Sequence, residues 1–470
     1  PPSMMPFGQE GNAVLEGSMA MSVTRSQAVR AGCCGMLIWA CLSAASAGAA
    51  TRTWPTVAPC NVGTLQACIT GAGVGDIVEI ATNTPVGEDL TVDKSLTLRP
   101  AAGYTPTIAG NFQFFQSTAS AATIVVDGLA FTSRIRAAPG SGNLDFSLLN
   151  STVTTSGSYT VAVDVSSGTF PPYGNVNAVI EGNTVTQTGG GVGDQCAGIS
   201  VGSIFDSGTS FARIAGNRVG VLGCGQGTAI SVYNGPGETM TADVIGNRVD
   251  ATNTNAGIML RNFQQAPNSQ LIVRAINNVV TGQLNEAGAP GGLVVSADGF
   301  QPIIATIVNN TLAHNDINLL VSGRTDLGAS ISGVIANNVV AFGRYGIDTD
   351  LGVAEHHNLF YPAPDGDDPF SPGPGSRIAD PRFVSSADLH LLPESPAIDR
   401  GSDAAVPGDI TTDIEGNPRI RQARVDMGAY ESPYMGLAPT VPVPALSPLG
   451  LLLAGLALTL AAMKRLRRVG

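Results

Sequence analysis

Residues 214–219 read I-A-G-N-R-V, and this pattern of an apolar run that ends in asparagine and then resumes occurs seven times in the 470-residue chain. Other copies are I-E-G-N-T-V at 180–185 and I-V-N-N-T-L at 307–312. Successive asparagines are 34, 30, 31, 32, 28 and 20 residues apart, a spacing typical of solenoid proteins. The asparagine column consists of Asn183, Asn217, Asn247, Asn278, Asn310, Asn338 and Asn358.

Most copies are followed by a second short apolar segment, such as G-I-S-V around Ile199 and A-I-S-V around Ile230. Short strands separated by glycine and asparagine predict the coils of a parallel β-helix. Asparagine suits the corner because it tolerates the left-handed backbone conformation and because its amide can hydrogen-bond to the same residue one rung away. We therefore interpret the asparagine column as structural rather than catalytic.

Alternating apolar residues around each asparagine identify the inward faces of the strands. The residue three positions before asparagine is in turn Ile180, Ile214, Val244, Ala275, Ile307 and Ile335. The residue two positions after it is Val185, Val219, Val249, Val280, Leu312 and Val340. A two-residue period places both sets inside the coil. Because no rung can bury its own apolar face, we predict a single all-β solenoid at 76–362 with an N-terminal cap at 51–75.

Residues 19–50 have the three parts of a secretory signal peptide. Arg25 and Arg30 precede an apolar run at 31–42, and a stretch of small residues ends at Ala50. We predict cleavage between Ala47 and Thr51. A short membrane anchor is the alternative, and a lipoprotein site at Cys41 is weaker. Residues 1–18 carry no targeting pattern and are interpreted as an upstream extension.

Four of the seven cysteines lie beyond the predicted signal peptide. An even number of cysteines in an exported chain indicates disulfides. Cys60 and Cys68 flank a short amphipathic stretch in the predicted cap, and Cys196 and Cys224 precede the second strand on consecutive rungs. We predict the disulfides Cys60–Cys68 and Cys196–Cys224.

An apolar run at 446–466 is long enough for one tilted membrane-spanning helix at about 1.5 Å per residue. It follows a linker at 433–445, and the basic residues at 464–468 would stay in the cytoplasm, which places the coil outside. We predict a transmembrane helix with a basic tail at 446–470. The helix is either a permanent anchor or part of a signal that is removed.

Two C-terminal segments resemble known bacterial modules. The first is a tripartite sequence made of a short motif, the apolar helix and the basic tail, with the residues Pro444, Leu446, Ser447, Gly450, Lys464 and Arg465. It resembles the Ile-Pro-Thr-Leu type of sorting signal of Gram-negative surface proteins, which implies an exosortase-like processing enzyme as a partner. The second, at 380–432, includes D-P-R-F-V and R-V-D-M-G-A-Y-E. It resembles the choice-of-anchor module that ends many bacterial right-handed parallel β-helix (pectin-lyase-like) surface proteins. This resemblance implies a right-handed coil and a cell-surface destination, but hardly any activity.

The module at 380–432 combines acidic residues with arginines. Its carboxylates could collect oxygen ligands for calcium: Asp399, Asp413, Asp426 and Glu431. Arginines lie among them: Arg400, Arg419, Arg421 and Arg424. We therefore favour a salt-bridged cap over the last rung, with no cofactor and with calcium as the alternative. The preceding segment at 363–379 is rich in Pro, Gly and Asp and predicts an exposed loop.

Enzymes that cut acidic polysaccharides need a dense cluster of carboxylates and cations. The outward column of the second strands offers one carboxylate in six rungs: Ser200, Ser231, Met259, Val294, Asn318 and Asp348. His314 with Asp316 and Asp348 is a weak candidate for an acid–base centre. No metal-binding or nucleophile motif stands in a credible context.

Arginines gather on one side of the predicted coil. Arg213 and Arg274 flank Asp243 on successive rungs, which we interpret as an alternating-charge ladder worth about 0.2–1 kcal/mol per pair. Arg218 and Arg248 directly follow neighbouring ladder asparagines. Together the four arginines form the one cationic patch that we infer, and an acidic glycan could bind there.

The net charge of the mature chain limits the classes of molecule that it can bind. Removing 1–50 and 441–470 takes six of 24 basic and two of 36 acidic residues, which leaves 18 and 34 and a net charge of about −16. Such an acidic surface excludes nucleic acid as a partner. We expect an exported cell-envelope protein that acts in adhesion or binds extracellular matrix or glycans without being an enzyme. The alternatives are a polysaccharide lyase or glycoside hydrolase, and a structural spacer.

Overall fold

The computed structural model describes residues 48–436, except 116–119, 158–159, 167–173, 192–195, 203–207, 236, 253, 263–268, 283–290, 298–301, 325–327, 344, 350–352 and 363–371. Residues 1–47, which include most of the predicted signal peptide, lie outside these residues, as do most of the linker, the sorting signal and the membrane helix at 446–470. Within the described part of the chain, no helix has the length and apolar character needed to cross a membrane.

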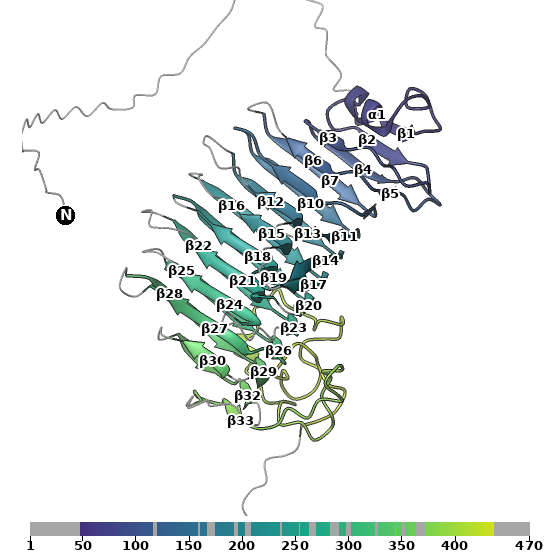
Figure 1. Ribbon diagram of the computed structural model, residues 1–470. Helices are drawn as coiled ribbons and strands as arrows, with labels where there is room; N and C mark the ends of the chain where they lie inside the picture. Colours follow the sequence, from purple (N-terminus) through teal and green to yellow (C-terminus); the bar gives the residue numbers. More distant parts are fainter. Residues whose placement is uncertain are drawn as a thin grey trace, which may run out of the picture. The chain divides into compact units, whose positions relative to one another are not determined.

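The chain coils through three parallel sheets in turn, which confirms the predicted all-β parallel β-helix (Figure 1). The first sheet contains β1 Thr51–Trp54, β2 Ile77–Ile80, β4 Leu96–Pro100, β7 Ala122–Asp127, β10 Leu144–Leu149, β13 Val176–Glu181, β16 Thr209–Ala215, β19 Thr239–Ile245, β22 Gln270–Ile276, β25 Pro302–Val308, β28 Ser330–Ala336 and β31 Ala354–His356. The second contains β5 Thr107–Ile108, β8 Ala130–Phe131, β11 Thr152–Ser156, β14 Thr184–Gly191, β17 Arg218–Cys224, β20 Arg248–Asp250, β23 Val279–Thr281, β26 Thr311–Ala313, β29 Val339–Gly343, β32 Leu359–Pro362 and β33 Arg377–Ile378. The third contains β3 Leu90–Val92, β6 Phe112–Phe115, β9 Ile135–Ala138, β12 Val161–Ser166, β15 Ala197–Gly202, β18 Thr228–Asn234, β21 Ala256–Asn262, β24 Leu293–Ala297, β27 Ile317–Gly323 and β30 Tyr345–Thr349.

The core lies inside the coil, as the alternation predicts. Ile180, Ile214 and Val244 occupy one register position of β13, β16 and β19, and all three are fully buried. In the second sheet, one register position is likewise held by buried valines: Val185, Val219 and Val249. The residues between these inward positions lie on the outer face. Successive rungs are about 4.8 Å apart, so the inward side chains of each rung pack against those of its neighbours.

The corner between the first and second sheets holds the asparagine ladder. The Asn217 backbone N–H and its Nδ2 both donate to Asn247 Oδ1, each at 3.0 Å, and Asn247 repeats this pair of bonds to Asn278 Oδ1. Nδ2 of each asparagine also donates to a carbonyl of the preceding rung, such as Ile214 for Asn247. Every polar atom of an interior ladder side chain is therefore used.

The residue with the left-handed backbone is not the ladder asparagine, contrary to the sequence prediction. It is the residue before it: Gly182, Gly216, Gly246, Asn277, Asn309, Asn337 and His357, with φ from 54° to 70°. The left-handed residue turns the chain from the first sheet into the second, and the next residue then points its side-chain amide into the coil. The ladder asparagines therefore come directly after the left-handed turn residue, and their side chains point into the coil.

Serines end the ladder on both sides. The Ser151 N–H donates to Asn183 Oδ1 at 2.8 Å, and the Asn358 N–H donates to Ser376 Oγ at 2.8 Å. The segment at 363–379 was predicted as an exposed loop, but its described part returns to the coil and adds β33 beside β32. The loop prediction was wrong for Arg377–Ile378, which pair as a short strand although both residues are exposed, as predicted.

The predicted cap contains β1, which pairs with β2, and the helix α1 Leu65–Gly71. Thr64 caps the helix by accepting from the Ala67 N–H at 3.1 Å, and Leu65, Cys68 and Ile69 bury its inner face. Both predicted disulfides, Cys60–Cys68 and Cys196–Cys224, are present.

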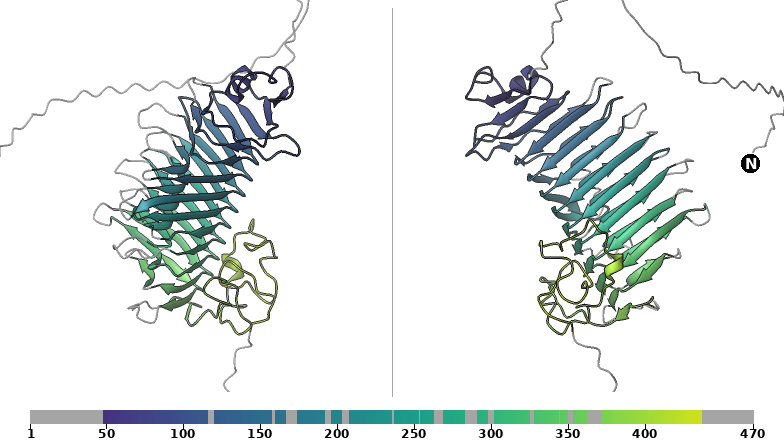
Figure 2. Two further views of the ribbon diagram at one scale, coloured as in Figure 1. Left: turned by 45° about the vertical axis from the view of Figure 1, so that its right-hand side comes forward. Right: turned by 180° about the vertical axis from the view of Figure 1, so that it is seen from behind.

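The C-terminal module does not cap the last rung. Its described residues lie along the outer face of the second sheet, beside β20, β23, β26 and β29 (Figures 1 and 2). A second apolar cluster joins the sheet to the module and includes Val279, Val339 and Leu359 with Phe383, Leu389, Leu391 and Met427. The module therefore covers a side of the coil.

Candidate functional site

The left-handed residues explain where the module docks. In the turns after β13, β16 and β19 this position is Gly182, Gly216 or Gly246, whereas in the next three turns it is asparagine. The asparagines Asn277, Asn309 and Asn337 form an outer asparagine column, parallel to the ladder but pointing away from the core. Asparagine is among the few residues that tolerate this backbone conformation, and it adds an amide that glycine lacks.

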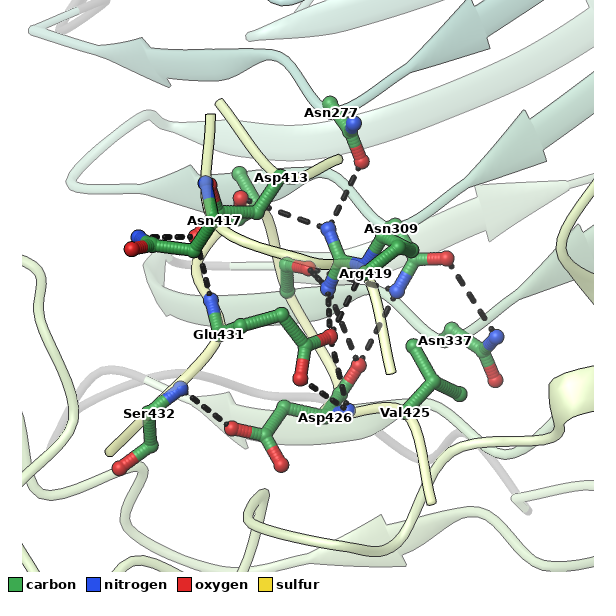
Figure 3. Close-up of polar contacts among 12 residues, drawn as sticks. Asn277, Asn309, Asn337, Asp413, Asn417, Arg419, Val425, Asp426, Glu431 and Ser432 are labelled. Carbon is green, nitrogen blue, oxygen red and sulfur yellow. Dashed lines mark hydrogen bonds and ion pairs between the residues drawn. The ribbon is translucent and has the colours of Figure 1, made fainter. Parts of the chain in front are cut away.

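Each member of the outer asparagine column hydrogen-bonds the module, and Figure 3 shows contacts of Asn277 and Asn309. Asn277 Nδ2 donates to the Thr412 carbonyl at 2.8 Å, and Asn309 Nδ2 donates to the Asp426 carbonyl at 3.0 Å. Asn337 Nδ2 donates to the Ser402 carbonyl at 3.0 Å, and its Oδ1 accepts from the Ser402 N–H at 2.7 Å. The column thus fixes three separate loops of the module.

Arg419 is the buried centre of this interface, and its side chain is 2% exposed (Figure 3). Its guanidinium donates to Asn277 Oδ1 at 2.8 Å, to the Gly428 carbonyl at 2.9 Å and to Glu431, with a closest distance of 2.6 Å. A buried arginine is tolerated only when its donors are satisfied, and here sheet and module satisfy them together.

The module carboxylates that could have held calcium accept hydrogen bonds from the chain itself. Asp399 accepts from the Ala423 and Gly436 N–H groups, and Asp413 accepts from those of Glu415, Asn417 and Glu431. Asp426 accepts from the Asp399 and Ser432 N–H groups. These contacts shape the loops of the module.

The four predicted arginines are split between two sheets. Arg213 lies in β16 between Glu181 at 3.7 Å and Asp243 at 3.8 Å. Arg274 lies in β22, binds Asp243 at 2.6 Å and reaches Asp409 of the module at 2.8 Å. The hydrogen bonds that Arg274 donates to Asp243 and Asp409 raise the pKa of its guanidinium, although its partial burial opposes this. The module's own acidic residue thus occupies part of the predicted cationic patch.

Arg248 joins a polar network that also crosses the interface. Its guanidinium donates to the Tyr430 hydroxyl at 2.6 Å and to Glu415 at 3.2 Å, and it lies over the Tyr430 ring. His390 bridges the other side, with Nε2 at 3.0 Å from Glu415 and Nδ1 at 2.5 Å from Asp388. Partial burial lowers the pKa of His390, but the bonds to Glu415 and Asp388 outweigh it and raise the pKa overall.

This network predicts a pH dependence. A group whose pKa is raised on folding stabilises the folded state. This stabilisation is fully present at pH values below the pKa in the unfolded chain, here 6.5, and is lost as the pH rises through the pKa in the folded protein. We expect the difference in thermal midpoint between the wild type and His390→Gln to be larger at about pH 5.5 than at about pH 8.5. An equal difference at both pH values in a thermal unfolding series would contradict this assignment.

Arg218 lies in an open-sided groove between the second sheet and the module. The groove has a volume of about 450 Å³, and its sheet side includes Thr184, Thr186, Arg218, Arg248 and Asp250. Ser386, Ala387, Leu389 and Tyr430 of the module form the other side. Arg218 is exposed, stands in register with Arg248, and forms no salt bridge with any residue that the structure describes. We call this hollow the sheet–module groove.

His314 packs against an aromatic side chain. Its ring stacks on Phe342 at 4.9 Å and 9°, and Phe342 in turn contacts Tyr361 edge-on. Burial lowers the pKa of His314. Asp316 follows two residues later in the same turn, and Asp348 lies in β30, where its side chain is outside the described residues.

The outward column of the third sheet differs from the prediction on one rung. Val294 pairs with Leu320, and Leu320 pairs with Asp348, so Leu320 takes the place assigned to Asn318. Asn318 is instead buried, and its Nδ2 donates to the Ala341 carbonyl at 3.2 Å. The prediction placed the outward residue two positions too early, at an asparagine whose side chain is buried.

Sequence reasoning missed a polar group at the start of the same column. Arg136 of β9 pairs in register with Asp164 of β12, and Arg136 Nε lies 3.7 Å from Asp164 Oδ2. Ser166 Oγ donates to Asp164 Oδ1 at 2.7 Å. Burial raises the pKa of Asp164 and raises that of Tyr233, two rungs on, to about 12. The alternation V-A-V-D-V at 161–165 was the available signal.

Comparisons with known proteins add little beyond the fold. No protein-family model matches the chain, and no curated protein matches it. The crystal structure of the pectate lyase Pel9A is similar to it over 78% of this chain and 90% of that one, with a TM-score of 0.38 and 12% identity.

Proposed function

We propose that this protein is an exported cell-envelope β-helix protein that binds an acidic glycan in the sheet–module groove without cleaving it. The observation that carries the proposal is Arg218, an exposed cation inside the groove with no described carboxylate partner. Arg248 beside it is already neutralised in part by Glu415. An anionic ligand would therefore be drawn to Arg218.

The chemistry of the groove suits a sugar acid. A guanidinium can bind a carboxylate or sulfate through two parallel hydrogen bonds. Thr184 and Thr186 supply hydroxyls for hydrogen bonds with sugar hydroxyl groups. Asp250 is the one acidic residue among those lining the groove, and its Oδ1 accepts from Thr252 at 2.8 Å. The lining residues that the structure describes therefore do not include the pair of carboxylates that glycoside hydrolysis requires.

The test is retention on acidic polysaccharides. We expect Arg218→Ala to weaken binding by about tenfold or more, since a tenfold loss corresponds to about 1.4 kcal/mol and charge-assisted bonds are typically worth that much. Arg99→Ala is the matched control, because Arg99 lies in the first sheet and carries the same charge. Equal retention of both variants would exclude the groove as the binding site.

Export and anchoring belong to the same proposal. Residues 19–50 would direct export, and the two disulfides support an oxidising destination. The segment at 446–470 would hold a precursor in the membrane for an exosortase-like enzyme, which would release the coil to the cell surface. Adhesion or matrix contact is the role that a glycan-binding surface protein would serve.

A polysaccharide lyase or glycoside hydrolase is the second candidate, and the polar group on the third sheet favours it. A carboxyl whose pKa is raised by burial, placed beside an arginine, suits proton transfer next to a bound acidic sugar. If this candidate is right, new chain ends will form and Asp164→Asn will abolish them.

A further inference from the structure

A block of buried polar residues lies at the corner between the third and first sheets. It consists of Asn234, Glu238, Asn262 and Ser269, which are between 0% and 2% exposed. This corner is far along each coil from the asparagine ladder, which lies between the first and second sheets. These four polar side chains form a buried polar group separate from the asparagine ladder.

The strand register shows that the four residues belong together. Asn234 and Asn262 are register partners at the ends of β18 and β21. Glu238 and Ser269 directly precede β19 and β22, whose first residues Thr239 and Gln270 are register partners. Asn234 Nδ2 donates to the carbonyls of Glu238 and Gln270, each at 3.0 Å, and so joins the two pairs. The block therefore spans two successive rungs of one corner.

Among the residues that the structure describes, several atoms in this block have no hydrogen-bond partner. They are Asn234 Oδ1, Ser269 Oγ and both side-chain polar atoms of Asn262. Each such buried atom costs about 1–3 kcal/mol when it stays unsatisfied. The ladder asparagines of the same coil use all their polar atoms, so an unsatisfied block is not a general property of this fold. A group that supplies contacts to oxygen atoms would remove this cost.

We propose that this corner is a calcium site, with Asn234 Oδ1, Asn262 Oδ1, Ser269 Oγ and the Glu238 carboxylate as its protein ligands. Amide, hydroxyl and carboxylate oxygens are the ligands of hard cations, and Ca²⁺ accepts six to eight of them in irregular geometry. Water completes the coordination. Mg²⁺ is excluded as the preferred ion because it demands a near-octahedral shell. The bound ion fastens two rungs to each other at a corner that lacks the ladder.

The experiment measures calcium binding by the purified full chain. After chelator treatment and dialysis, elemental analysis and calorimetric titration with Ca²⁺ should give one ion per chain. At about 1 mM Ca²⁺ the thermal midpoint should rise relative to EDTA, whereas the same concentration of Mg²⁺ should leave it almost unchanged. No binding and identical midpoints in EDTA and Ca²⁺ would overturn the proposal and indicate buried water in the block.

Two variants locate the ion. Glu238→Gln should weaken Ca²⁺ binding at least tenfold and abolish the calcium-dependent shift, while Glu79→Gln, which removes the same charge from the first sheet, should keep both. If Glu238→Gln does not fold, Asn262→Ala is the second variant, because it removes one ligand and no charge. Calcium binding that is unchanged in a folded variant of either residue would place the ion elsewhere and overturn the assignment.

Discussion

Replacing Arg419 with methionine is expected to release the C-terminal module from the second sheet. The change leaves the Glu431 carboxylate buried without its cation and removes the bonds to Asn277 and Gly428. Breaking one partner of a buried ion pair typically costs about 3–5 kcal/mol. Urea unfolding followed by limited proteolysis should show cleavage within 380–432 at a denaturant concentration that leaves the wild type intact.

The control for this prediction is Arg421→Met, which changes an exposed arginine two residues away. A second route to the same interface is the triple variant Asn277→Gly, Asn309→Gly and Asn337→Gly. Glycine keeps the left-handed backbone and removes only the amides that bind the module. If Arg419→Met and the triple variant both resist proteolysis like the wild type, the docking interface is wrongly assigned.

The second large effect is expected within the ladder. In Asn247→Ala, the N–H and Nδ2 of Asn217 lose their acceptor, and the Ile214 carbonyl loses its donor. Since unsatisfied buried groups cost about 1–3 kcal/mol each, we expect a loss of about 3 kcal/mol or more in the free energy of unfolding. The turn residue before Asn247 is Gly246, which has no side-chain amide, so the bonds lost here are separate from those of the outer asparagine column.

Equilibrium urea unfolding checks this prediction against Asn177→Ala. Asn177 lies on the outer face of the first sheet, where its Nδ2 donates to Asp145 at 2.8 Å, and its loss should change stability by less than about 0.5 kcal/mol. Similar unfolding midpoints for the two variants would show that the ladder contributes no more than a surface hydrogen bond.

The coil itself was predictable because its signal is repeated. Ile214 and Val219 sit inside as the two-residue period requires, and the ladder bonds run through the predicted asparagines. The left-handed position was misassigned by one residue, since Gly216-Asn217 and Asn277-Asn278 both place asparagine near the turn. The spacing of the asparagines alone does not distinguish the left-handed turn residue from the residue that follows it.

The sequence contained a signal for the turns that bind the module, but the sequence analysis did not use it. The copies change from Gly-Asn to Asn-Asn at Asn277, which is where module contacts with the turn residues begin. The pairing of Arg274 with Asp409 and of Arg248 with Glu415 was not predictable in the same way. These partners are 135 and 167 residues apart, and no local pattern reports how a loop-rich segment folds back.

The most direct test of the proposed function is to incubate the protein, purified from an oxidising compartment, with acidic and neutral polysaccharides and to record both retention and new chain ends. The account predicts retention on at least one acidic polysaccharide, loss of that retention in Arg218→Ala, and no new reducing or unsaturated ends. New ends that form in the wild type and disappear in Asp164→Asn would contradict it and make the protein an enzyme.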